Sequence, residues 1–233
     1  MKIVDITNAV LYKTVIACTK VRVWLQFKLK LTKAYQPSIF NERDQSKSSR
    51  ECQNRFDDIS NSLPDLPLSC LDVGCNEGYF TFRMSQRGGF CHGIDKGRNE
   101  IMIADGLAKI NNINNVSFSN AEIDVDYISG LPHYDVIIFM SVFHHIARHN
   151  GLEYAEEFMS ALSRINRKYL VFETGQPDEL NTSWAEDLAF MGSDIESWVS
   201  KMLKKSGYNK ISVIGKNSGI YSNVNRLLFL AEK

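Results

Sequence analysis

The chain has 233 residues, of which 44% are hydrophobic and 11% aromatic, so it can bury a sizeable core in one α/β domain with a modest extension. Lys plus Arg and Asp plus Glu number 27 each, and this zero formal net charge argues against a large nucleic-acid footprint. The five cysteines form no CxxC pair, and their odd number disfavours a disulfide framework or a zinc site. We therefore predict no metal site and a reducing, cytoplasmic location.

The first 35 residues form a basic segment in which Asp5 is the single acidic residue. Apolar residues alternate strictly over residues 21–31, which is typical of a strand, but Trp24 and Phe27 also share one stripe of a helix, and we favour the helix. The segment either docks on the following domain or makes peripheral contact with an anionic membrane or a large substrate. No run of about 18 apolar residues occurs, so we expect no membrane-spanning helix.

A polar stretch at residues 41–50 is typical of a linker, and residues 50–62 favour a short helix with Phe56 and Ile59 facing inward. We therefore place an N-terminal basic extension and linker at residues 1–66. An α/β domain follows at residues 67–233.

From residue 68 onward, the pattern predicts strands that alternate with helices, as in a doubly wound, mostly parallel sheet. A short segment at residues 121–129 and a long irregular region at residues 174–193 interrupt the alternation. The predicted strands are 68–73, 90–95, 116–119, 134–140, 169–173, 209–215 and 225–232, and the predicted helices are 77–87, 98–110, 151–165 and 194–206.

The first strand of this domain leads into the loop Asp-Val-Gly-Cys-Asn-Glu-Gly, residues 72–78. Gly74 and Gly78 supply permissive torsions and let a ligand approach the backbone closely. A dinucleotide-binding G-x-G-x-x-G pattern would require two more glycines, which disfavours a nicotinamide oxidoreductase. Asp95 ends the second strand, where a carboxylate can accept both hydroxyls of a ribose.

Further candidate binding residues follow the next two strands. Asn120 and Ala121 follow the third strand, and Met140 and Ser141 end the fourth. A pair of histidines, His144 and His145, comes directly afterwards. Ligands of open α/β sheets bind at such carboxyl ends of strands.

Together, the order and spacing of these motifs over residues 68–233 resemble those of the class I S-adenosylmethionine-dependent methyltransferases of small molecules. The loop at 72–78 is similar to their motif I with Asn76 in place of a glycine, and residues 135–145 resemble motif IV and its loop. The resemblance implies a Rossmann-like, seven-stranded sheet with an antiparallel last strand, and S-adenosylmethionine as cofactor. It assigns cofactor binding to Asp72, Gly74, Cys75, Asn76, Gly78, Tyr79, Asp95, Lys96, Asn120, Ala121, Met140 and Ser141. Asn120 departs from the family, which usually carries Asp there.

The resemblance implies methyl transfer to an oxygen or nitrogen, and such an acceptor can require a base with a pKa near the working pH. His144, His145 and Glu173 are the candidates at strand ends. We expect a small-molecule, saccharide or lipid-linked acceptor, with RNA disfavoured. Trp184, in the long irregular region, either stacks on the substrate or packs that region down. The alternative to an enzyme is a non-catalytic, methyltransferase-like binding protein.

Overall fold

The computed structural model describes residues 35–40, 51–219 and 224–233. The predicted basic element at residues 1–35, apart from Tyr35, and the predicted linker at residues 41–50 lie outside the described residues. Among the helices in these ranges, none is both long and apolar enough to cross a membrane.

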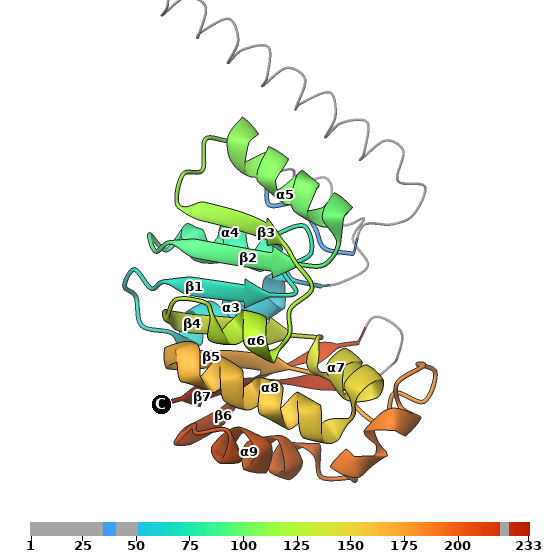
Figure 1. The fold of residues 1–233 in the computed structure, drawn as a ribbon. Helices are drawn as coiled ribbons and strands as arrows, with labels where there is room; N and C mark the ends of the chain where they lie inside the picture. The colour runs from blue at the N-terminus through green and yellow to red at the C-terminus, as the bar shows by residue number, and fades with distance from the viewer. Residues whose placement is uncertain (1–34, 41–50, 220–223) are drawn as a thin grey trace, which may run out of the picture.

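One seven-stranded sheet organises the described part of the chain, in the order β3-β2-β1-β4-β5-β7-β6 (Figure 1). The first five strands are parallel, and β7 runs antiparallel between β5 and β6. This topology confirms the predicted fold class. The strands are β1 (Cys70–Val73), β2 (Cys91–Asp95), β3 (Val116–Asn120), β4 (Tyr134–Met140), β5 (Asn166–Glu173), β6 (Lys210–Ser218) and β7 (Asn225–Glu232).

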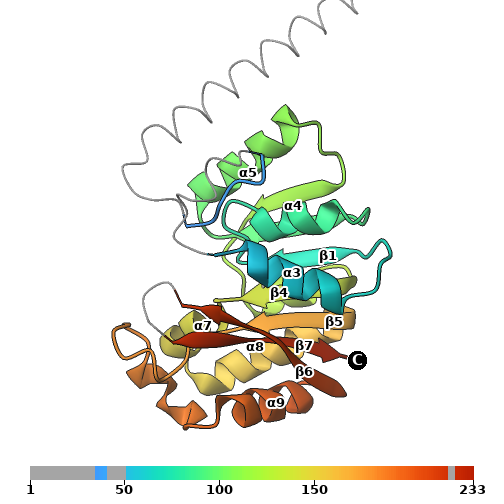
Figure 2. The ribbon, with the colours of Figure 1, turned by 180° about the vertical axis from the view of Figure 1, so that it is seen from behind.

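Helices cover both faces of the sheet. One face carries α3 (Gln53–Ser62) and α4 (Tyr79–Ser85), and α5 (Arg98–Ile110) lies against β2 and β3 (Figure 2). The other face carries α6 (Val125–Ser129), α8 (Leu152–Ile165) and α9 (Ile195–Lys205) (Figure 1). Two more helices, α7 (Phe143–Asn150) and the 3-10 helix η1 (Glu186–Met191), lie at the edge where the parallel strands end.

The central strand β4 shows how the sequence builds the two-sided core. Ile137 and Phe139 belong to the cluster that includes Phe158 and Leu162 of α8, whereas Val136 and Ile138 belong to the cluster on the α3 side. Successive side chains of a strand point to opposite faces. A strand covered on both faces therefore needs an unbroken apolar run.

The structure refines several predicted boundaries. The sequence predicted no helix at α7, which fills the gap between β4 and the predicted helix at 151–165. Gly151, with φ 87°, separates α7 from α8. The strand predicted at 169–173 begins at Asn166, directly after α8.

The predicted helix near residues 50–62 is confirmed as α3, with Phe56 and Ile59 buried. This helix packs on β6 and β7. The domain boundary at residue 66 stays a prediction. Helix α3 lies before this boundary in the chain, yet it packs on the sheet of the domain that follows.

Candidate active site

A cleft of about 960 Å³ lies at the carboxyl ends of β1, β2 and β4. Its size is that of a small-molecule or cofactor site. Ten of the residues predicted to form the site line it: Asp72, Gly74, Asn76, Asp95, Lys96, Ala121, Met140, Ser141, His144 and His145.

The β1–α4 loop forms one wall with an unusual backbone. Gly74 and Gly78 have φ values of 78° and 85°, and Asn76 between them has φ 53°. A Cβ atom at Gly74 would collide with the side chain of Val142, and one at Gly78 would lie 2.8 Å from the ring of Phe118. Gly74 therefore lets the loops after β1 and β4 meet, whereas Gly78 allows close packing behind the cleft wall.

Two carboxylates stand at the ends of β1 and β2. Asp72 accepts a hydrogen bond from the Thr81 hydroxyl at 2.7 Å, which joins β1 to α4. Asp95 accepts from the backbone N–H groups of Asn76 at 2.8 Å and Gly97 at 2.7 Å, one on each carboxylate oxygen. A carboxylate offers about four acceptor positions, so Asp95 retains two for a ligand.

Other predicted cofactor residues support the cleft without lining it. Cys75 and Tyr79 are buried behind the loop. Asn120 donates from Nδ2 to the carbonyls of Asp95 at 3.1 Å and Lys96 at 2.9 Å, so its amide holds the turn after β2. The three residues after Ala121, namely Glu122, Ile123 and Asp124, line the cleft instead. Their position directly after the third strand could have indicated from the sequence that they line the cleft.

Ser141 joins the two sides of the cleft. Its backbone has φ 60°, and its N–H donates to the Glu173 carbonyl at 2.7 Å. Its hydroxyl lies 3.2 Å from a Glu173 carboxylate oxygen and accepts from Arg226 Nη1 at 3.0 Å. A non-glycine residue held in this region is strained, and the surrounding bonds maintain it.

Two buried ion pairs flank Ser141. Arg55 of α3 pairs with Glu173 through Nε–Oε2 at 2.7 Å, and both side chains are at most 1% exposed. Arg226 of β7 makes a bidentate pair with Glu179, at 2.7 and 2.8 Å. Arg226 lines the cleft, whereas Glu173 does not. No sequence pattern indicates Arg55, Glu179 and Arg226, because the partners in each pair are far apart in the chain.

His144 is buried, and its environment fixes its tautomer. Its Nδ1 accepts from the backbone N–H of Gly175 at 3.0 Å. The proton of the neutral ring therefore resides on Nε2, and the ring acts as a donor there. The ring also packs on Trp184, with centroids 4.8 Å apart.

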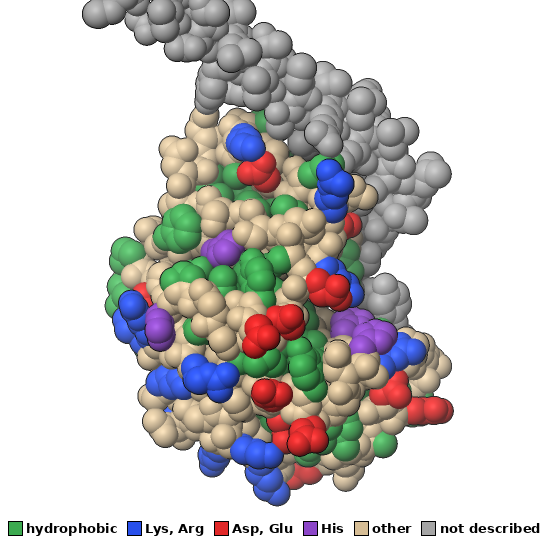
Figure 3. Space-filling view, in the orientation of Figure 1, with side chains coloured by type: hydrophobic (Ala, Val, Ile, Leu, Met, Phe, Trp, Pro, Cys, Tyr) green, Lys and Arg blue, Asp and Glu red, His purple; other side chains and the backbone are tan. Residues whose placement is uncertain are grey.

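His145 is exposed beside His144, with ring centroids 4.2 Å apart. Figure 3 shows histidine side chains grouped over α7. Partial desolvation, reinforced by nearby positive charges, lowers the pKa of His145 below its ordinary value of 6.5. The charges belong to Lys96, His149, Arg226 and Arg148. His145 is therefore neutral at neutral pH and available to accept a proton.

A family model described as "Methyltransferase domain" matches residues 67–215. The chain belongs to this methyltransferase family. The prediction of a class I S-adenosylmethionine-dependent methyltransferase, with S-adenosylmethionine as cofactor, is thereby confirmed.

The methyltransferase domain has a curated relative in the O-antigen chain terminator bifunctional methyltransferase/kinase WbdD of Escherichia coli, 27% identical over 149 residues. The match covers 60% of this chain and 21% of WbdD, so the chain spans about a fifth of the length of the curated relatives it matches.

Solved structures share the fold of this methyltransferase. A structure of WbdD has a TM-score of 0.77 at 22% identity, covering 90% of this chain and 45% of that one. Magnesium protoporphyrin IX methyltransferase from Synechocystis PCC 6803, with bound S-adenosylmethionine, has a TM-score of 0.54 at 17% identity, covering 76% and 74%.

The cleft of this methyltransferase fits its cofactor. The amide oxygen of Asn76 is buried in the motif I loop and has no hydrogen-bond partner within the described ranges. Buried acceptors are rarely left unpaired, so this oxygen suits a ligand with an N–H or O–H donor. S-adenosylmethionine carries such donors on its ammonium group and its ribose, and Asp95 has acceptor positions to spare.

Proposed function

We propose that this domain transfers a methyl group from S-adenosylmethionine to an oxygen or nitrogen of a saccharide, lipid-linked or small-molecule acceptor, with His145 as general base. One observation carries the proposal: two adjacent histidines at the cleft have different surroundings. His144 is held as a donor by Gly175, and His145 is kept neutral at the cleft rim.

The cofactor side of the cleft supplies acceptors. We assign the two ribose hydroxyls to Asp95, the ammonium group to Asn76 and Asp72, and the adenine edge to residues 121–123. When bound, the cofactor supplies a methyl group that is already activated on a sulfonium.

On the other side, the residues position the acceptor and remove its proton. A well-oriented pair of reactants can gain about 7–11 kcal/mol over free reactants. His145 takes the proton from the acceptor hydroxyl or amine, because its ring is unprotonated at neutral pH. His144 donates from Nε2 and orients the acceptor. Glu173, predicted as a base, instead acts through Ser141, because Arg55 holds it behind the cleft wall.

The acceptor class rests on two supports. WbdD is named for an O-antigen chain, which favours a saccharide or lipid-linked acceptor for this chain as well. The zero net charge disfavours RNA, whose recognition usually needs a basic surface. A cytoplasmic location and peripheral membrane contact through residues 1–35 stay predictions.

The test is an acceptor screen with methyl-labelled S-adenosylmethionine, comparing the full chain with His145→Gln. We expect transfer to a saccharide or lipid-linked acceptor. His145→Gln should lower kcat about 100-fold or more, which is the usual contribution of a general base. Its affinity for S-adenosylhomocysteine should stay within a few fold.

His133→Gln is the matched control, because His133 is exposed and does not line the cleft. This variant should keep its full rate. A His145→Gln variant that transfers methyl groups as fast as His133→Gln would exclude the proposed base. Transfer to RNA in place of saccharides would exclude the proposed acceptor class.

A further inference from the structure

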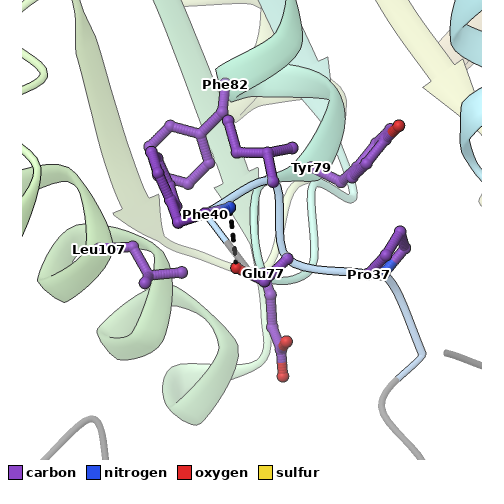
Figure 4. Close-up of a pocket in the computed structure, with 8 residues that line it drawn as sticks. Pro37, Phe40, Glu77, Tyr79, Phe82 and Leu107 are labelled. Carbon is purple, nitrogen blue, oxygen red and sulfur yellow. Dashed lines mark hydrogen bonds between the residues drawn. The ribbon is translucent and has the colours of Figure 1, made fainter. Parts of the chain in front are cut away.

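A short segment upstream of the matched family region lies against the cofactor loop. Residues 35–40 run past the start of α4, where Phe40 meets Phe82 edge-to-face with ring centroids 5.0 Å apart. Figure 4 shows a small pocket that Pro37 and Phe40 line together with Glu77, Tyr79, Phe82 and Leu107. Two residues of the same segment, Tyr35 and Gln36, line the cofactor cleft.

Gln36 is the polar residue at this contact, and only 4% of its surface is exposed. Its Oε1 accepts from the backbone N–H of Tyr79 at 3.2 Å. This bond fixes the orientation of the amide, because only the oxygen end can accept from an N–H group. The other end, Nε2, carries two N–H donors, and neither has an acceptor among the described residues.

The side chains that line the cleft at the ends of β1 and β2 are mainly acceptors, and Lys96 is the cation that follows them. Asp72, tied to α4 through Thr81, and Asp95 are carboxylates. Asn76 offers its unpaired amide oxygen. These acceptors match the ammonium and hydroxyl groups of the cofactor, whereas its carboxylate requires a donor.

We propose that Gln36 is a cofactor-binding residue whose Nε2 donates to the methionine carboxylate of the bound cofactor. This inference rests on the proposed function and deepens it. Gln36 then has two roles: its oxygen holds the start of α4, and its nitrogen selects for a ligand that carries a carboxylate. A residue outside the α/β domain boundary predicted from the sequence thus helps to set cofactor specificity.

Two variants of the full chain separate these roles. Gln36→Glu keeps an oxygen for the Tyr79 N–H but replaces the donor with a negative charge, and Gln36→Met removes both functions at similar length. The ligands are S-adenosylhomocysteine, which has the carboxylate, and 5′-methylthioadenosine, which keeps the adenosine but lacks the amino-acid part. Affinities are measured by calorimetry.

We expect Gln36→Glu to weaken S-adenosylhomocysteine binding about 10- to 100-fold, since a hydrogen bond to a charged group is lost and repulsion is added. Its affinity for 5′-methylthioadenosine should stay within about twofold, because the new carboxylate still accepts from the Tyr79 N–H and this ligand has no carboxylate to repel. Gln36→Met, which also loses the bond to Tyr79, should weaken binding of both ligands, and binding of S-adenosylhomocysteine more strongly. Gln86→Glu, an exposed change at the end of α4, is the control and should alter neither affinity.

An equal loss of both affinities would make Gln36 a loop-holding residue and overturn the proposal. Unchanged binding of S-adenosylhomocysteine to Gln36→Glu would overturn it too. A wild-type chain that binds neither ligand would instead refute the cofactor site itself, and the inference with it.

Discussion

The cofactor half of the cleft and its acceptor half are built in different ways. The cofactor half, at the ends of β1 to β3, uses backbone turns and acceptor groups: Gly74, Asn76 and Asp95. The acceptor half, at the ends of β4 and β5 and the beginning of β7, uses buried ion pairs around Ser141. The cofactor half is suited to binding one invariant ligand. The acceptor half is held by buried charges, each of which needs its partner for neutralisation.

This difference predicts how each half fails. Removing one side chain from the cofactor half loses a ligand contact but leaves no buried charge without its partner. Removing one partner from the acceptor half leaves an uncompensated buried charge, which destabilises the folded state as well as the site.

The largest effect is expected for Glu179→Ala, which leaves the Arg226 guanidinium buried without its carboxylate. Breaking a buried ion pair in this way costs about 3–5 kcal/mol. Urea unfolding measures the loss. Glu186→Ala, an exposed change in the same region, should stay within about 0.5 kcal/mol of the wild type. Equal stability of the two variants would contradict the contrast between the halves.

The next effect is expected for Asp95→Ala, which removes the acceptor for the ribose hydroxyls. Hydrogen bonds to charged groups contribute about 1.5–3 kcal/mol, so cofactor affinity should fall about 10- to 100-fold while the fold persists. Calorimetry with S-adenosylhomocysteine measures this loss. Asp105→Ala, at an exposed position on α5, is the control. If both variants bind equally well, Asp95 is only a turn residue.

The smallest effect concerns the pH dependence of the acceptor half. A general base must be unprotonated to act. The rate should therefore fall as the pH drops through the lowered pKa of His145, and it should be at its maximum above pH 6.5, the ordinary pKa of histidine. Arg148→Met removes one of the charges that lower this pKa, so the acid limb of the kcat profile should move to higher pH. The shift should be small, because desolvation is the main cause.

Lys109→Met, which removes a charge from the exposed pair on α5, should leave the pH profile in place. A limb that moves to lower pH in Arg148→Met would contradict the assignment of His145 as base.

Most residues predicted for the cofactor half line the cleft, because that half is local in the chain. The loop at residues 72–78 lies within one β–α unit, and Asp95 marks the end of the next strand. The alternation of apolar runs with helical segments also predicted the sheet, including the inward positions of Phe56 and Ile59 in α3.

The acceptor half could not be predicted in this way. Arg55 and Glu173 are 118 positions apart, and Arg226 and Ser141 are 85 apart. No periodicity links such residues, because their contact is created by the packing of α3 and β7. The role of Gln36 could not be predicted for the same reason, because its partner Tyr79 lies 43 residues away in the chain, beyond a polar stretch.

The antiparallel insertion of β7 has a consequence for the order in which the molecule folds. Because β7 runs against β5, its first residues lie at the edge where β4 and β5 end, and Arg226 reaches Ser141 from there. All other strands precede β7 in the chain, so the cofactor loop and Asp95 are synthesised as complete β–α units earlier. Contacts of short sequence separation form first, and regions open in cooperative units. We therefore expect the cofactor half to fold before the acceptor half. We also expect that local opening of the β6–β7 pair releases Arg226 while the cofactor loop stays folded.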